Sequence, residues 1–126
     1  MAVVLVAEDD PDVHVLLEML LMAAGHSTLM VRDGATALEM IEASPEIDLV
    51  LLDVAMPGEI DGLGATRAIR SRPGSAELPV LLLSARSQQE HIQEGLDAGA
   101  NDYVVKPFDT DTLLATITSL LERRAC

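Results

Sequence analysis

The chain has 126 residues, of which 8 are Lys or Arg and 21 are Asp or Glu, so its formal net charge at pH 7 is -13. This length suits one compact domain, which buries about two-thirds of the surface that the unfolded chain exposes, and it excludes a second domain of similar size. The negative field around the surface repels phosphate backbones and anionic membranes, which argues against direct binding to nucleic acid or to a membrane.

Two further features favour the cytoplasm. The one cysteine, Cys126, cannot form a disulfide within the chain, as is usual in a reducing compartment. The apolar run that follows Met1 is too short to span a bilayer, and no basic segment precedes it as a signal peptide would require. We therefore expect a cytoplasmic protein.

Five short apolar runs, rich in valine and leucine, alternate with longer amphipathic stretches. This alternation is typical of strand-helix-strand units around a parallel sheet. The predicted strands are Val3–Ala7, Ser27–Val31, Leu49–Asp53, Val80–Ser84 and Asp102–Lys106. The first and third are almost wholly apolar, as are strands that are buried on both faces. The sequence therefore predicts an α/β fold, with a doubly wound five-stranded parallel sheet flanked by five helices.

Capping residues mark the ends of the predicted helices. Asp10, Asp33 and Asp109 each precede a helix start, where the side-chain oxygen can accept a hydrogen bond from an otherwise unpaired amide. Gly25 and Gly99 are candidate C-caps, because glycine adopts the left-handed conformation without strain. The predicted helices are Pro11–Ala24, Ala35–Ser44, Gly62–Arg70, Ser87–Ala98 and Thr110–Arg124.

Acidic residues end two of the apolar runs. Glu8, Asp9 and Asp10 follow the first predicted strand, and Asp53 ends the third. If these strands are parallel neighbours, their carboxyl ends meet where open α/β sheets place their ligands. Crowded like charges cost free energy unless a cation or a helix N-terminus compensates them. We assign Asp10 to capping, and the other three to a magnesium site, because Mg2+ prefers oxygen ligands and is usually held by carboxylates together with a phosphate.

Three strand-end residues are suited to phosphoryl chemistry. Asp53 is a candidate nucleophile, because a carboxylate can attack phosphorus when a cation neutralises the repulsion. Ser84 offers a hydroxyl, and Lys106, the only lysine, offers a compact charge for a phosphoryl oxygen. Taken singly, Asp53 could be a turn or cap residue, Ser84 a structural serine and Lys106 an exposed surface lysine. Their order at successive strand ends favours the phosphoryl site. The peptide between Lys106 and Pro107 can be cis.

The motifs in combination point to one family. They are Glu8-Asp9, Asp53 with Met56-Pro57, Asp61-Gly62, Ser84-Ala85, Asp102-Tyr103 and Lys106-Pro107-Phe108. From Val3 to about Arg124 the chain resembles the receiver domain of bacterial two-component response regulators. The resemblance implies a flavodoxin-like receiver fold with strand order 2-1-3-4-5. We expect residues 1–126 to form a single receiver domain of the stand-alone type, with no output domain in this chain.

The resemblance also implies a reaction and a metal. Asp53 is expected to accept a phosphoryl group from a histidine kinase or a histidine phosphotransfer protein. Mg2+ is expected to be held by Asp9, by Asp53 and by the backbone carbonyl of Ala55, with Glu8 acting through water.

The remaining roles that the resemblance implies concern the response to phosphorylation. Ser84 and Lys106 are expected to bind the phosphoryl oxygens. Tyr103 is expected to be an aromatic switch that turns inward when Ser84 is drawn to the phosphate. The switched state is then expected to change binding to a downstream protein effector.

The sequence departs from the family pattern in two places. Many receivers have Met-Pro-x-Met-Asp-Gly after the phosphorylation site, whereas residues 56–62 read MPGEIDG, which is one residue longer. DNA-binding members that dimerise through the last strand and its flanking helices usually carry arginines where this chain has Thr116 and Thr118, although the acidic partners Asp97 and Asp102 are present. We therefore expect a monomer or a weak dimer.

The first predicted helix suggests a docking surface. Pro11–Ala24 has few polar residues, and helical spacing predicts that His14 and Glu18 mark its solvent-facing stripe. Leu21 and Met22 then fall on or beside this stripe. Exposed apolar residues there are either scattered surface residues, which are common, or a patch for a partner helix, and we favour the patch. Because related receivers pack this helix against the helical bundle that bears the donor histidine, we expect these two residues to contact the phosphodonor.

The same motifs also occur, in altered form, in proteins with other functions. The chain could be a receiver fragment of a longer regulator or of a hybrid kinase. An aspartyl phosphatase generally needs a second aspartate two residues after the nucleophile, and here that residue is Ala55. A non-phosphorylated adaptor normally has a damaged acidic pair, aspartate or lysine, and all of these are intact. We therefore expect a phosphoacceptor rather than an enzyme, with turnover of its own aspartyl phosphate alone.

Overall fold

The structure, a computed structural model, describes residues 2–125 and the side chains of residues 2–123. Cys126, for which we predicted no disulfide, lies outside the described residues. The strands are β1 (Val3–Ala7), β2 (Ser27–Val31), β3 (Leu49–Asp53), β4 (Val80–Ser84) and β5 (Asp102–Val105). The helices are α1 (Pro11–Ala23), α2 (Gly34–Ala43), α3 (Gly62–Ser71), α4 (Gln89–Asp97) and α5 (Thr110–Ala125). Within residues 2–125, no helix is both long enough and apolar enough to cross a membrane.

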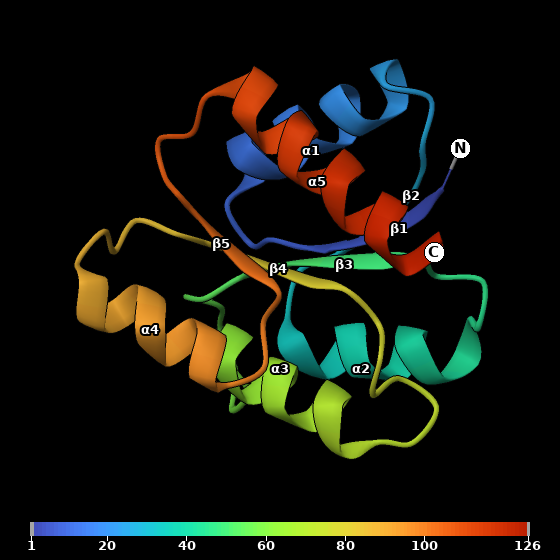
Figure 1. Cartoon of the computed structure of the whole chain (residues 1–126), viewed down its shortest axis with the longest axis vertical. Coiled ribbons are helices and arrows are strands. Elements are labelled where there is room, and N and C mark those ends of the chain that lie inside the picture. Colours follow the sequence, from blue (N-terminus) through green and yellow to red (C-terminus); the bar gives the residue numbers. More distant parts are fainter. Residues whose placement is uncertain (1, 126) are drawn as a thin grey trace.

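The five strands form one parallel sheet in the order β2-β1-β3-β4-β5, which confirms the predicted doubly wound fold. Figure 1 shows α1 and α5 on one face of the sheet and α2, α3 and α4 on the other. β5 is one residue shorter than predicted and ends at Val105. Lys106 still donates its backbone N–H to Ser84 O at 2.8 Å, but the chain bends at residues 106 and 107, and the strand ends there.

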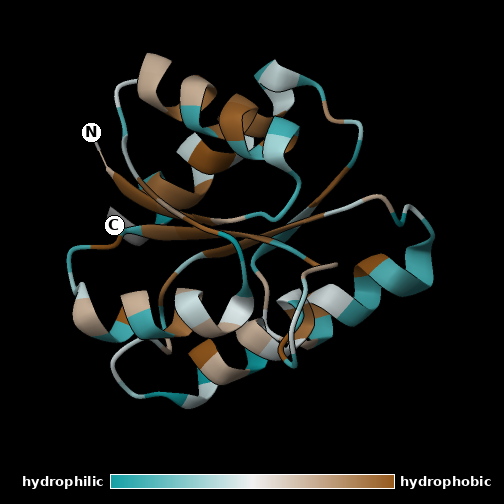
Figure 2. Cartoon of the chain, turned by 180° about the vertical axis from the view of Figure 1, so that it is seen from behind, coloured by the Kyte–Doolittle hydropathy of each residue, from teal (hydrophilic) through white to brown (hydrophobic). Residues whose placement is uncertain are grey.

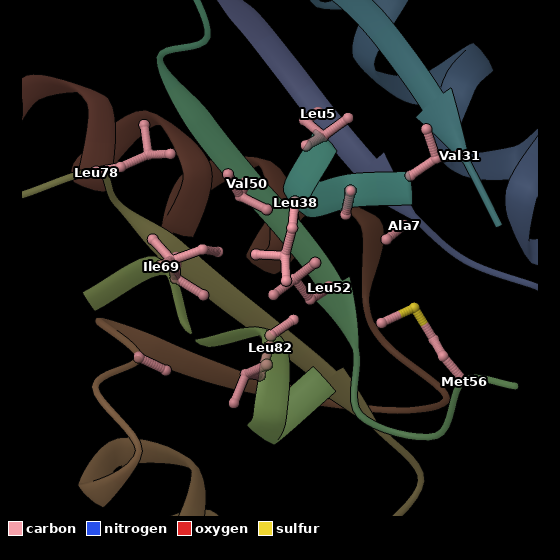
Figure 3. Close-up of a cluster of buried hydrophobic side chains, with 14 of the residues drawn as sticks. Leu5, Ala7, Val31, Leu38, Val50, Leu52, Met56, Ile69, Leu78 and Leu82 are labelled. Atoms are coloured by element: carbon pink, nitrogen blue, oxygen red, sulfur yellow. The ribbon is translucent and has the colours of Figure 1, made fainter. Parts of the chain in front are cut away.

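Two hydrophobic clusters, one on each side of the sheet, form the core. Alternate strand residues face α2 and α3 on one side and α1 and α5 on the other, as strand geometry requires. Figure 3 shows the first cluster, in which strand residues such as Leu52 and Leu82 lie close to Leu38 of α2 and Ile69 of α3. All residues of β3 and β4 are buried, which explains their unbroken apolar runs. Figure 2 shows the same strands in the colour of hydrophobic residues.

Aspartate side chains cap the N-termini of the helices that follow the strands. Asp10 Oδ1 accepts a hydrogen bond from Asp12 N at 2.9 Å, and Asp33 Oδ1 accepts one from Thr36 N at 2.7 Å. Asp61 Oδ1 caps α3 by accepting from Gly64 N at 2.8 Å. These caps hold the turns at the carboxyl edge of the sheet, where the candidate site lies.

Candidate functional site

Four predicted site residues converge at the carboxyl edge of the sheet. Glu8 directly follows β1, Asp53 ends β3, Ser84 ends β4 and Lys106 directly follows β5. Because β1, β3, β4 and β5 are parallel neighbours, their ends lie side by side. Glu8, Asp53 and Ser84 are buried, with exposed fractions of 0%, 5% and 4%. The Lys106–Pro107 peptide is cis.

Lys106 is the counter-ion of two carboxylates. Its Nζ lies 2.6 Å from Asp53 Oδ2 and 2.8 Å from Glu8 Oε1. Burial alone would lower the pKa of Lys106, but the hydrogen bonds to Asp53 and Glu8 outweigh it, so this pKa is raised. The lysine is therefore charged at neutral pH and is not an exposed surface ammonium.

Glu8 is the most perturbed acid of the site. Burial, reinforced by the neighbouring Asp53 carboxylate, raises the pKa of Glu8 to about 7, against the opposing contact with Lys106. The Asp10 backbone N–H donates to Glu8 Oε2 at 3.1 Å, which further fixes the carboxyl group. The single positive charge of Lys106 therefore does not balance the two carboxylates of Glu8 and Asp53.

The acidic cluster consists of Glu8, Asp9 and Asp53. Each offers one carboxylate oxygen, and these oxygens all lie within 4.8 Å of one another. Glu8 and Asp53 are buried whereas Asp9 is exposed, so the cluster opens to solvent on the Asp9 side. Three carboxylates beside one ammonium form a donor set that suits a hard divalent cation such as Mg2+. The backbone N–H of Ala55 donates to Asp53 Oδ1 at 3.0 Å, which places the Ala55 turn directly beside the cluster.

The backbone of Arg86 lies between Ser84 and Tyr103. Ser84 Oγ accepts a hydrogen bond from Arg86 N at 3.1 Å, and the Tyr103 hydroxyl donates to Arg86 O at 2.9 Å. Tyr103 is half-buried in β5. The two predicted switch residues are therefore connected through one residue of the loop between β4 and α4.

Two residues near the site were not predicted from their own chemistry. His14 was expected in the solvent-facing stripe of α1, but it is half-buried and its Nδ1 lies 3.1 Å from Glu8 O. Gly62 packs against the strand that bears the candidate nucleophile: a Cβ there would overlap Asp53 O and would lie 2.7 Å from Val54 Cα. The only signal for Gly62 was its place in the Asp61-Gly62 motif.

The loop of residues 56–62 folds over the start of α2. Gly58 has φ +93°, a left-handed conformation that favours glycine. Ile60 lies so close to α2 that a Cβ on Gly34 would be 2.7 Å from Ile60 O. The longer loop also borders a cavity of about 410 Å3, which is lined by Asp33, Ala35, Thr36, Pro57, Gly58, Glu59 and Ile60.

The exposed face of α1 differs from the prediction. Leu21, expected at the surface, is 1% exposed and packs in the cluster between α1, α5 and the sheet, whereas Met22 is 61% exposed as expected. Leu17 and Leu21, four residues apart, form the inward face of the helix. The exposed apolar stripe instead consists of Val15, Leu16, Met19 and Met22. The prediction for Leu21 is therefore wrong.

Comparisons with known proteins agree with this geometry. The family model of the response regulator receiver domain matches residues 4–118. The transcriptional regulatory protein YrkP of Bacillus subtilis is 42% identical over 95% of this chain and 49% of its own length. The response regulator MprA of Mycobacterium avium is 43% identical over 95% of this chain and 51% of its own length. The chain thus spans about half the length of the curated relatives it matches.

Solved structures give the same result. A putative response regulator from Chloroflexus aurantiacus superimposes with a TM-score of 0.91 at 33% identity, covering 96% of this chain and 98% of that chain. The receiver domain of the sensor histidine kinase PA1611 from Pseudomonas aeruginosa, with a magnesium ion in its active site cleft, has a TM-score of 0.88 at 30% identity, covering 96% and 98% of the two chains. The chain belongs to the family of response regulator receiver domains of two-component systems.

Proposed function

We propose that Asp53 accepts a phosphoryl group from the phosphohistidine of a histidine kinase or a histidine phosphotransfer protein. One Asp53 oxygen forms the new bond to phosphorus, the bond between phosphorus and the donor imidazole breaks, and the imidazole leaves. The observation that carries this proposal is the setting of Asp53, a buried carboxylate that contacts Lys106 Nζ at 2.6 Å beside two further acids. A carboxylate in this setting needs only positioning and charge compensation to act as an acceptor.

The acidic cluster fits Mg2+ as the required cation. The carboxylates of Asp9 and Asp53 and the carbonyl of Ala55 would hold it, with Glu8 acting through a water molecule. When bound, Mg2+ neutralises the repulsion between the Asp53 carboxylate and the incoming phosphoryl group. The fit is supported by the oxygen-only donor set and by the surplus of carboxylates over ammonium groups.

Lys106 and Ser84 complete the phosphoryl site. Lys106 Nζ already contacts the oxygen of Asp53 that faces it, so it would donate to oxygens of a phosphoryl group attached there. The Ser84 hydroxyl, at the end of the neighbouring strand, would donate to another oxygen. Ala55 stands where an aspartyl phosphatase needs its general acid, so we infer no enzymatic activity beyond turnover of the aspartyl phosphate.

The same serine would start the conformational switch. If Ser84 turns toward the phosphoryl group, its hydrogen bond with Arg86 N weakens and the loop that binds the Tyr103 hydroxyl can move. Tyr103 and this loop would then bind a downstream protein effector differently. A useful shift in population requires that phosphorylation favour one arrangement over the other by about 1–5 kcal/mol.

The exposed stripe of α1 is the proposed docking surface for the phosphodonor. Met22 lies in it together with Val15, Leu16 and Met19. These apolar side chains lie three or four residues apart, so they are adjacent on the helix surface and are not scattered singly. A helix of the histidine-bearing bundle would cover them.

We further propose that residues 1–126 form a single receiver domain that acts in the cytoplasm, as a monomer or weak dimer, and without direct contact to nucleic acid. The net charge of -13 supports the last point. Thr116 donates its hydroxyl to Thr112 O, and Asp97 accepts from Gln93, so these positions bond locally in α5 and α4. The half-length coverage of the curated relatives also fits a receiver segment of a longer regulator.

Mass spectrometry after incubation with acetyl phosphate and Mg2+ tests the phosphoacceptor. One phosphoryl group is expected on Asp53 and none in Asp53→Asn. Asp111→Asn, which changes an exposed acid of α5, is the matched control and should be labelled like the wild type. Labelling that persists in Asp53→Asn would assign the acceptor to another residue.

A further inference from the structure

Gly95 of α4 lies against two neighbouring strands. Leu82 of β4 and Tyr103 of β5 are paired in the parallel register, and both approach this glycine. A Cβ on Gly95 would lie 2.9 Å from Leu82 Cδ1, 2.9 Å from Tyr103 Cδ2 and 3.2 Å from Tyr103 Cε2. These separations are shorter than van der Waals contact, so the space beside Gly95 holds the tyrosine ring only because position 95 has no side chain.

The two neighbours of Gly95 differ in their freedom to move. Leu82 is fully buried within the cluster between the sheet, α2 and α3, where a new rotamer would collide with other core side chains. Tyr103 is half-buried on the edge strand of the sheet, and its hydroxyl is held by the hydrogen bond to Arg86 O. A side chain at position 95 would therefore displace the ring of Tyr103 outward rather than repack Leu82.

We propose that Gly95 is a positioning residue for Tyr103: the missing side chain leaves the space that the ring of Tyr103 occupies in this structure, and a methyl group at position 95 shifts the ring toward solvent. The structural part of this proposal rests on the packing of Gly95, Leu82 and Tyr103. Its consequence for signalling rests on the proposed function, in which Tyr103 is the switch. The atoms nearest to a Cβ at Gly95 belong to Leu82 and Tyr103, so a methyl group there would set the output of the switch without changing the reaction at Asp53.

The composition of the chain makes the test specific. Tyr103 is the only tyrosine and there is no tryptophan, so the intrinsic fluorescence reports on this one ring. In Gly95→Ala, we expect a higher acrylamide quenching constant for Tyr103 than in the wild type. Gly74→Ala is the matched control, because a Cβ on Gly74 meets nothing within 4 Å, and it should quench like the wild type. An unchanged quenching constant in Gly95→Ala would overturn the proposal.

A double-mutant cycle measures the contact independently, even if Gly95→Ala is poorly stable. Alanine is the better helix former, so in the Tyr103→Ala background, where no ring remains, Gly95→Ala should leave the melting temperature unchanged or raise it. With Tyr103 present, the methyl group should collide with the ring. Gly95→Ala should then shift the melting temperature downward relative to the shift that it causes in the Tyr103→Ala background. Equal shifts in both backgrounds would mean that the methyl group collides with Leu82 and not with the ring.

Phosphorylation of Asp53 combined with fluorescence quenching of Tyr103 tests the role of Gly95 separately from the proposed function. Labelling of Asp53 by acetyl phosphate should be the same in Gly95→Ala and in the wild type. In the wild type, labelling with Mg2+ should change the quenching constant of Tyr103, and this change should shrink in Gly95→Ala. If the wild type shows no change on labelling, Tyr103 is not the switch and the proposed signalling consequence fails, while quenching of the unlabelled variants still decides the role of Gly95.

Discussion

Lys106 Nζ lies 2.6 Å from Asp53 Oδ2, although the two residues are 53 positions apart in the chain. The same ammonium contacts Glu8, which lies 98 positions away, at 2.8 Å. One positive charge thus compensates two buried carboxylates from two other strand ends. The shortage of positive charge explains the affinity expected for a divalent cation, and burial, reinforced by the neighbouring Asp53 carboxylate, raises the pKa of Glu8.

Stability without metal should depend on pH through Glu8. The pKa of this group is about 7 in the folded protein, above its ordinary value of 4.5, so the folded state binds more protons between these values. The free energy of unfolding should therefore fall as pH rises through this window, with at most about 1.4 kcal/mol per pH unit from this group. Urea titrations in a chelating buffer measure it. Glu8→Gln should flatten the fall, and an identical slope in the variant would assign it to other groups.

Millimolar Mg2+ should raise the melting temperature, because a ligand that binds only the folded state stabilises it by mass action. Asp9→Asn should abolish this response. It should also raise the stability of the metal-free protein, by under about 1 kcal/mol because Asp9 is exposed. Calorimetry with and without Mg2+ gives both values, and Asp111→Asn serves as the control acid. A Mg2+ response of full size in Asp9→Asn would place the cation elsewhere.

The exposed stripe of α1 predicts a selective effect on phosphotransfer. Met19→Glu with Met22→Glu should slow transfer from the cognate histidine donor and leave acetyl phosphate labelling of Asp53 nearly unchanged. Rapid-quench measurements of both reactions separate docking from chemistry. If both reactions slow together, the helix affects the geometry of the site instead.

Leu21 should behave differently from its neighbour Met22. Because it is fully buried, Leu21→Ala should lower the free energy of unfolding by about 2–5 kcal/mol, as is usual for large-to-small changes in a core. Met22→Ala should cost little. Chemical denaturation compares the two, and equal costs would contradict the burial of Leu21.

Gly62 should tolerate no side chain. The Cβ of alanine would overlap the backbone of Asp53 and approach Val54 Cα, so Gly62→Ala should cost about 1–3 kcal/mol or more and impair labelling of Asp53. Gly64→Ala is the matched control in the same helix, because its Cβ would approach only the side chains of Asp61 and Ile60, at 3.4 Å. Urea denaturation of both variants tests the contrast. Equal stability would mean that the turn can relax.

The alternation of apolar runs was enough to predict four strands with their observed ends, and aspartate caps and glycines located three helix starts and two helix ends to within one residue. These signals are local: a fully buried strand needs an apolar run, and a helix start needs a partner for its first amides. The grouping of Glu8, Asp53, Ser84 and Lys106 followed from the same local signals, because parallel neighbours bring their ends to one edge. The strand order itself came from the family resemblance.

The orientation of α1 could not be predicted, because eight of the ten residues 13–22 are apolar and no stripe stands out. Contact with the sheet selects Leu17 and Leu21 as the inward face. The close approaches of Gly62 to Asp53 and of Gly95 to Tyr103, like the contact of His14 with Glu8, join residues whose own sequence neighbourhoods carry no distance information. Local periodicity thus determined the elements and the edge at which the chemistry gathers, whereas the packing of helices on the sheet decided which side chains are exposed, which carboxylates share Lys106, and where only glycine fits.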